Sequence, residues 1–272
     1  MRLALAGAVL ALALGAHAAP VAFVADIRGN ATIEGDGKLG FLAELAPGTK
    51  VLLGSGAVAS ITYAATGAEF TVAGPGEFLV TSTEVKAEKG AGPKRRNVAT
   101  LPDLAVVGRT AQTATASLRM RGLASAAPTP SAPALEYPVA TRIATLQPTM
   151  RWRGALDDEV TVALLDAGGR ELWKGRAKPD GTRPGVKLAP ATRYSWTLMT
   201  ARGPVGEAQF ETLPAEAIAR AEKSRAGAHS FSSRVMHALL LQDIGAQQEA
   251  REAWGGLARE RPDLPELGVL AR

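Results

Sequence analysis

A run of short alternating segments separated by glycine and proline, from Leu45 to Val80, restricts this chain to few folds. Turns are predicted at Pro47-Gly48, at Gly67 and at Gly74-Pro75-Gly76. Between the turns, residues alternate in polarity, and the members of one face are Ala57, Ala59, Ile61 and Tyr63. Short strands joined by tight turns are typical of antiparallel β domains. We therefore predict that residues 19–123 form a small antiparallel β-roll or barrel.

The order of elements in this region resembles the FecR-type periplasmic domain. It comprises a glycine-led strand (Gly29 to Glu34), a Leu-x-Pro-Gly turn (Leu45 to Gly48), a Gly-Ser-Gly-Ala-x-Ala element (Gly54 to Ala59) and a glycine-then-strand unit (Gly67 to Val72). The resemblance covers residues 21–85 and implies an extracytoplasmic module that mediates protein contacts and carries no catalytic residue. The best-known members are transmembrane anti-sigma regulators. This sequence has no internal membrane span of that kind, so the regulatory role is not carried over.

The N-terminus has the pattern of a secretory signal peptide. Arg2 precedes an apolar run, Leu3 to Leu14, which is too short to span a bilayer, and Ala16-His17-Ala18 is a small-x-small cleavage site. We predict cleavage after residue 18 and a periplasmic location. The chain has no cysteine, which excludes disulfides and thiolate metal sites.

Basic residues crowd the segment that follows the first strands. They are Lys86, Lys89, Lys94, Arg95 and Arg96. We interpret the segment as a solvated loop; the alternative is contact of Lys94, Arg95 and Arg96 with an anionic surface such as phospholipid or cell-wall polymer. No aromatic residues are interleaved with the basic ones, and export argues against DNA, so no nucleic-acid partner is predicted.

A second β module is predicted at residues 138–213, after an Ala/Pro/Ser/Thr-rich spacer at residues 124–137. The spacing Leu188-x-Pro-x-Thr-x-Tyr194 resembles the entry to a late strand of fibronectin type III domains. That resemblance implies an immunoglobulin-like β-sandwich whose Tyr194 hydroxyl bonds back to the backbone at a corner. Trp152 is then a core residue, and Trp196 lies on the same side of its strand as Tyr194. The alternative is a sugar-binding platform of Trp152, Trp173 and Trp196, with Trp173 the most exposed.

The pattern changes to helical periodicity in residues 214–272. A helix is predicted from Ala215 to Arg225, and a second begins near Ser230 and closes at Gly245. The following spacing of Ala250, Trp254, Leu257 and Pro262 resembles a single tetratricopeptide-type hairpin.

This predicted tail has more apolar surface than two helices can bury between them. We predict that Phe231, Val235, Leu239 and Trp254 form an interface with a partner protein or a second copy of the chain. The short connection at Leu213-Pro214 leaves little freedom for the tail to fold back on the sandwich.

Catalytic motifs are not apparent. His229 and His237 have no accompanying carboxylate or serine motif, and we interpret both as surface or interface histidines. We predict a mainly β, non-enzymatic chain with no cofactor or metal. Our functional hypothesis is an exported interaction or scaffold protein of the bacterial cell envelope, in envelope signalling or assembly. The alternative is a binder of peptidoglycan or exopolysaccharide.

Overall fold

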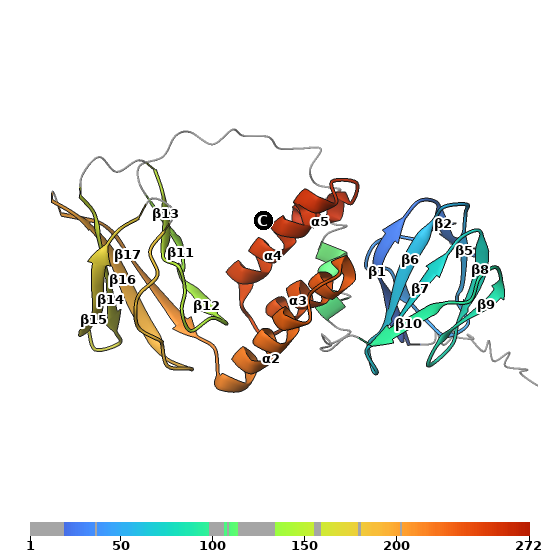
Figure 1. Ribbon diagram of the computed structural model, residues 1–272, viewed down its shortest axis with the longest axis horizontal. Helices are drawn as coiled ribbons and strands as arrows, with labels where there is room; N and C mark the ends of the chain where they lie inside the picture. Colours follow the sequence, from blue (N-terminus) through green and yellow to red (C-terminus); the bar gives the residue numbers. More distant parts are fainter. Residues whose placement is uncertain are drawn as a thin grey trace, which may run out of the picture.

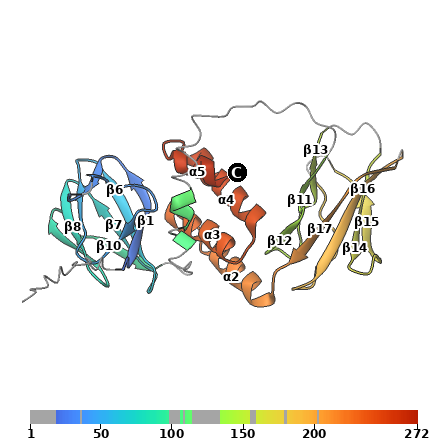
Figure 2. The ribbon, with the colours of Figure 1, turned by 180° about the vertical axis from the view of Figure 1, so that it is seen from behind.

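The computed structural model describes residues 19–35, 37–97, 106–107, 109–113, 134–154, 159–178, 181–201 and 203–272. Two β modules lie at opposite ends of the molecule, and the C-terminal helices lie between them (Figures 1 and 2). The chain is mainly β with a helical C-terminal region, as the sequence predicts. The predicted signal peptide and residues 124–133 of the predicted spacer lie outside the described residues.

The first β module consists of two antiparallel sheets that share one core. One sheet has the order β10-β7-β6-β1-β4 and the other β3-β2-β5-β8-β9. The strands are β1 (Ala22–Arg28), β2 (Ala31–Ile33), β3 (Gly37–Lys38), β4 (Glu44–Leu45), β5 (Lys50–Leu53), β6 (Val58–Tyr63), β7 (Ala68–Ala73), β8 (Gly76–Val80), β9 (Val85–Lys89) and β10 (Lys94–Asn97). Ala57, Ala59, Ile61 and Tyr63, which the alternation places on one face, are all buried, but Ser60 and Thr62 of the opposite face are buried too.

The backbone conformation just before β2 requires a glycine at position 29. Its φ of 78° lies in the left-handed region, and a Cβ there would come within 2.9 Å of the Ala57 Cα atom. The basic segment interpreted as a solvated loop lies mostly on strands, because Lys86 and Lys89 belong to β9 and Lys94 to Asn97 pair with β7 as an edge strand. Residues 106–107 and 109–113 are helical, and Val107 joins the core of this module.

The second β module contains a two-stranded sheet, β11-β13, and a five-stranded sheet, β12-β17-β16-β14-β15. The strands are β11 (Ala134–Tyr137), β12 (Thr141–Ile143), β13 (Arg151–Arg153), β14 (Thr161–Asp166), β15 (Glu171–Arg176), β16 (Arg193–Thr200) and β17 (Gly203–Thr212). All pairs are antiparallel except β12 with β17. Strand β11 lies inside the range assigned to the spacer, so the module begins before residue 138.

The aromatic residues of this module mostly follow the prediction. The backbone N–H of Ala189 donates to the Tyr194 hydroxyl at 2.9 Å, which is the predicted corner bond. Trp196 is fully buried and donates from Nε1 to the carbonyl oxygen of Pro138 at 2.7 Å. Trp152 is only half-buried and packs at the edge of the core, so its assignment as a core residue holds in part.

The C-terminal region forms four helices: α2 (Ala215–Ala226), α3 (Phe231–Asp243), α4 (Gln247–Glu260) and α5 (Pro265–Leu270). Ser230 caps α3, because its hydroxyl accepts from the backbone N–H of Ser233 while the Ser233 hydroxyl accepts from the N–H of Ser230. Within the described part of the chain, no helix is long and apolar enough to cross a membrane.

The first β module covers the apolar face of α3 and α4. Phe231, Val235, Leu239 and Trp254 are at most 7% exposed and belong to the same hydrophobic cluster as the β-module core. The Trp254 ring meets Phe41 edge to face, with 6.5 Å between the ring centroids. The prediction that a partner or second copy covers these four residues is therefore wrong, because the chain covers them itself.

Candidate functional site

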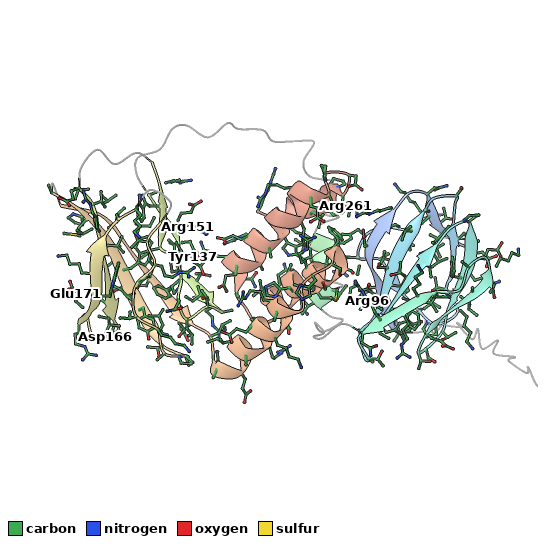
Figure 3. The ribbon with its side chains drawn as sticks, viewed as in Figure 1. Arg96, Tyr137, Arg151, Asp166, Glu171 and Arg261 are labelled. Atoms are coloured by element: carbon green, nitrogen blue, oxygen red, sulfur yellow. The ribbon has the colours of Figure 1, made fainter. Side chains whose placement is uncertain are left out.

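A buried arginine joins the end of the helical tail to the first β module. The Arg261 side chain is 6% exposed, and it forms an ion pair with Asp26 of β1. It also donates to the carbonyl oxygen of Ile27 at 2.6 Å and to Asp263 at 2.7 Å. Its guanidinium carbon lies 5.1 Å from the Phe231 ring centroid. Hydrogen bonds from Arg261 to Asp263 and Asp26 raise the pKa of the guanidinium further, so the charge is kept and compensated (Figure 3).

A second arginine makes a similar link from β10. Arg96 contacts the fully buried carboxylate of Glu69 at 2.6 Å and donates to the Ser230 and Ser232 hydroxyls, each at 2.6 Å. Arg96 is thus occupied by internal contacts and is not free for the anionic surface that the sequence suggested. Lys94 and Arg95 of the same prediction are exposed, and the Arg95 guanidinium lies 6.0 Å from the Phe70 ring centroid.

The opposite side of the tail meets the second β module through a small apolar cluster, which includes Ala144 and Leu241, and through hydrogen bonds. Glu249 of α4 accepts from the Ala144 N–H at 2.6 Å and from the Tyr137 hydroxyl at 3.2 Å. Gln248 accepts from the Val139 N–H at 3.1 Å and donates to the Glu136 carbonyl oxygen at 2.9 Å. Burial raises the pKa of the Glu249 carboxyl, and the bonds from Ala144 and Tyr137 offset part of that effect.

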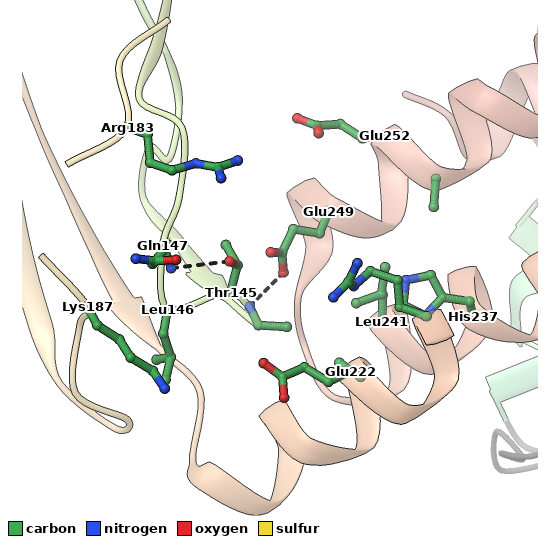
Figure 4. Close-up of a pocket in the computed structure, with 14 residues that line it drawn as sticks. Thr145, Leu146, Gln147, Arg183, Lys187, Glu222, His237, Leu241, Glu249 and Glu252 are labelled. Atoms are coloured by element: carbon green, nitrogen blue, oxygen red, sulfur yellow. Dashed lines mark hydrogen bonds between the residues drawn. The ribbon is translucent and has the colours of Figure 1, made fainter. Parts of the chain in front are cut away.

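A cavity of about 610 Å³ opens beside these bonds, and we call it the seam cleft (Figure 4). Two loops of the second β module form one wall, and α2, α3 and α4 form the other. The lining residues are Ala144, Thr145, Leu146, Gln147, Arg183, Lys187, Ala221, Glu222, Arg225, His237, Leu241, Glu249, Glu252 and Ala253. A second hollow of about 580 Å³ adjoins it at Glu252.

Charged side chains of the seam cleft are divided between its walls. The sandwich wall contributes Arg183 and Lys187, while the helical wall contributes Glu222, Glu249 and Glu252 together with Arg225. Figure 4 shows the labelled basic side chains extending from the sandwich and the labelled carboxylates from the helices. Glu252 is already paired with Arg151 of β13.

His237 also lines the seam cleft, which the sequence did not indicate. Burial lowers the pKa of its imidazole, and the positive charge of Arg225 adds to this effect. Its Nδ1 atom is buried and has no hydrogen-bond partner among the described residues. His229, in contrast, is exposed, as predicted. Across the described ranges, no group of three or more His, Asp or Glu side chains is arranged to hold a metal ion.

The three-tryptophan platform is not assembled. Trp196 is inside the sandwich core, while Trp152 lies on β13 of one sheet and Trp173 on β15 of the other. Trp152 and Trp173 are both half-buried. A sugar site that needs all three rings on one surface is therefore inconsistent with the structure.

No protein-family model, curated protein or solved structure matches the chain. The resemblances to FecR-type, fibronectin type III and tetratricopeptide modules accordingly stay predictions.

Proposed function

We propose that this chain is an exported, non-enzymatic scaffold protein of the bacterial cell envelope that presents two β modules to protein partners. The observation that supports the proposal is the position of the helical tail. It shares a buried core with the first module and a hydrogen-bonded seam with the second, although the sequence places it after both. The tail thus connects the two modules and fixes the position of each relative to the other.

The free energy of the contacts between the tail and the first module favours a lasting arrangement over a transient one. Burial of one large apolar side chain contributes about 1.5–3 kcal/mol, and α3 and α4 bury several against the first module. Separation would also expose that apolar surface and break the hydrogen bonds of Arg261 and Arg96. A scaffold needs this property, because its partners must meet surfaces at a fixed distance and angle.

Charged edge strands suggest how partners bind. Strands β9 and β10 lie at the edges of the two sheets of the first module and carry exposed Lys86, Lys89 and Lys94. Lysines on an edge strand hinder the addition of another strand. We therefore expect partners to contact side chains on the faces and loops of the modules rather than to extend their sheets.

Site-specific photo-crosslinking in the native envelope tests the proposal. A crosslinking residue at Lys94 or at Lys174 should capture the same envelope proteins reproducibly, because both positions are exposed. The matched control is Val235, which is buried and should yield no intermolecular product. Absence of any captured protein above the level of an unrelated exported protein would contradict the scaffold role.

Sedimentation with purified cell-wall sacculi tests the carbohydrate alternative. Loss of binding at moderate salt would indicate only attraction between basic side chains and anionic polymer. Binding that persists at high salt and is abolished by Trp173→Ala would favour polymer recognition and count against the scaffold.

A further inference from the structure

Two polar side chains are fully buried on the outer face of a sheet in the first β module. Thr62 of β6 and Glu69 of β7 each have an exposed fraction of 0%, and they lie directly opposite each other in this antiparallel pair. Side chains of such a pair point to the same face of the sheet. The next residue, Tyr63, points to the other face, where its hydroxyl donates to the carbonyl oxygen of Thr81 in the second sheet's β8–β9 connection at 3.0 Å. Thr62 and Glu69 therefore point away from the second sheet.

The helical tail covers this outer face. Helix α3 contacts β1, which is the neighbour of β6 in the sheet (Figure 1). Arg96 lies opposite Glu69 on β10 and donates to the Ser232 hydroxyl at the start of α3, and Ser232 is itself only 3% exposed. The two buried side chains thus lie at the interface between the module and the tail, where bulk water does not reach them.

Each of these side chains has one oxygen atom that lacks a hydrogen-bond partner among the described residues. The atoms are Thr62 Oγ1 and Glu69 Oε2. The other carboxylate oxygen of Glu69 pairs with Arg96 at 2.6 Å, so the negative charge is compensated although Oε2 is not bonded. Buried polar atoms almost always have a partner, either in the protein or in an ordered water molecule. Two such atoms on directly opposed residues indicate one shared partner.

The distances suit a single bridging molecule. The Cβ atoms of a directly opposed pair are about 4.5–5.5 Å apart. A water molecule that bonds to two oxygens at about 2.8 Å each can join atoms up to about 5.6 Å apart. Thr62 and Glu69 are close enough for this bridge, and their two free oxygens do not bond to each other directly.

Electrostatics favours a neutral ligand at this position. The carboxylate of Glu69 repels an anion, and the guanidinium of Arg96, which already neutralises that carboxylate, disfavours a cation. Water is neutral, donates two hydrogen bonds and accepts two. It can therefore donate to the carboxylate oxygen and accept from the Thr62 hydroxyl at the same time.

We propose that one water molecule is bound inside this interface and bridges Thr62 Oγ1 to Glu69 Oε2. With this water in place, a continuous chain of hydrogen bonds runs from β6 through Glu69 and Arg96 to Ser232 of α3. The water is then part of the contact between the first module and the tail. Internal waters of this kind satisfy polar groups that the protein alone leaves unpaired.

A crystal structure of the mature chain, at a resolution that shows ordered water, tests the proposal directly. We expect one solvent peak within about 2.6–3.2 Å of both Thr62 Oγ1 and Glu69 Oε2. A direct hydrogen bond between the two side chains, or the absence of a solvent peak there, would overturn the proposal. A peak with the short, many-oxygen coordination of a metal cation would overturn it as well.

Oxygen-17 relaxation dispersion tests the same site in solution, because it counts water molecules that stay inside the protein. Thr62→Val removes the hydroxyl with little change of shape and should lose one long-lived water per molecule. Thr62→Ser keeps a hydroxyl and should retain that water. The matched control is Thr71→Val, which removes a hydroxyl from the same face of β7 at a half-buried position and should leave the count unchanged.

Equal counts for Thr62→Val and the unaltered chain would overturn the proposal. If Thr62→Val fails to fold, as circular dichroism would show, the crystal structure of the unaltered chain decides alone. The outcome is independent of the scaffold proposal, because crosslinking concerns exposed positions of the modules and the water concerns a buried interface. Either proposal can fail while the other holds.

Discussion

The two sides of the helical tail differ in how they contact the β modules. Towards the first module, α3 and α4 share a continuous hydrophobic core with the β strands. Arg261 and Arg96 add buried hydrogen bonds and ion pairs to this interface. Towards the second, a smaller apolar cluster joins Ala144 to Ile218 and Leu241. Hydrogen bonds of Gln248 and Glu249 add to it, and an open cavity lies beside them. The first interface is larger and more apolar, whereas the second combines a small apolar cluster with hydrogen bonds and leaves a cavity open. We therefore expect substitutions at the first interface to cost more stability than substitutions at the second.

The largest expected loss of stability comes from a substitution at the centre of the apolar interface between the tail and the first module. Trp254→Ala should lower the free energy of unfolding by about 3–5 kcal/mol, because it removes a fully buried ring and its edge contact with Phe41. Denaturant unfolding measures the change. The exposed His229→Ala on the same tail is the control and should leave stability nearly unchanged. A loss below about 1 kcal/mol for Trp254→Ala would remove the basis of the comparison.

Substitution of Arg261 tests how much its hydrogen bonds and ion pair at that interface contribute to the free energy of unfolding. Arg261→Ala should cost about 2–3 kcal/mol, because Asp26 and the Ile27 carbonyl oxygen lose a charged donor. Arg234→Ala removes an ion pair between half-exposed side chains of the tail, with Glu260, and should cost much less. Thermal or denaturant unfolding distinguishes them, and equal effects would show that burial of Arg261 has no special role.

A smaller loss of stability is expected where the tail contacts the second β module. Gln248→Ala removes two hydrogen bonds to the second module and should cost about 1–2 kcal/mol. The neighbouring Gln247→Ala is the matched control, since among the described residues the Gln247 side chain bonds to the Gln242 carbonyl oxygen of the tail and to nothing in the second module. If Gln248→Ala matched the effect of Trp254→Ala, the two sides would not differ in the way described.

The smallest effects are pH-dependent and arise at the seam cleft. The pKa of the Glu249 carboxyl is raised from 4.5 in the native state. Between pH 4.5 and that raised value, the native state therefore retains a proton that the unfolded state has lost. Glu249 should therefore reduce stability as pH rises from 4.5 to its raised value. His237, whose pKa is lowered from 6.5, should increase stability as pH rises from its lowered value to 6.5.

Unfolding free energies measured across this pH range for Glu249→Gln and His237→Gln would separate the two contributions. Each variant should lose one slope and keep the other. If neither variant altered the pH profile, neither group would titrate differently in the folded and unfolded states.

Local patterns in the sequence predicted local structure well. The strand predicted around Ala59 to Tyr63 and the bond between the Tyr194 hydroxyl and the backbone are both present, and each depends on residues close together in the chain. Strand β10 was missed, because Lys-Arg-Arg-Asn has no alternation and is a strand only through its pairing with β7. Strand β11 was missed for a similar reason, since it borders a proline-rich segment and depends on β13.

The long-range contacts left no comparable local signal. Asp26 and Arg261 meet across almost the whole chain, and nothing near either residue identifies the other. The excess of apolar residues in α3 and α4 correctly indicated that something must cover them, but not what. The seam cleft was also missed, because Arg183, Lys187 and Glu222 come from separate segments and each resembles an ordinary solvated charge.

The contact between β1 and the segment after α4 has a consequence for biogenesis. A ribosome makes the first β module long before it makes Trp254 and Arg261, which complete the core of that module. Until Trp254 is synthesised, the surface around Phe41 lacks this cover and is exposed to aggregation. Native contacts of such large sequence separation also slow folding. The folded first module therefore depends on residues that are synthesised about 200 positions later to cover its surface.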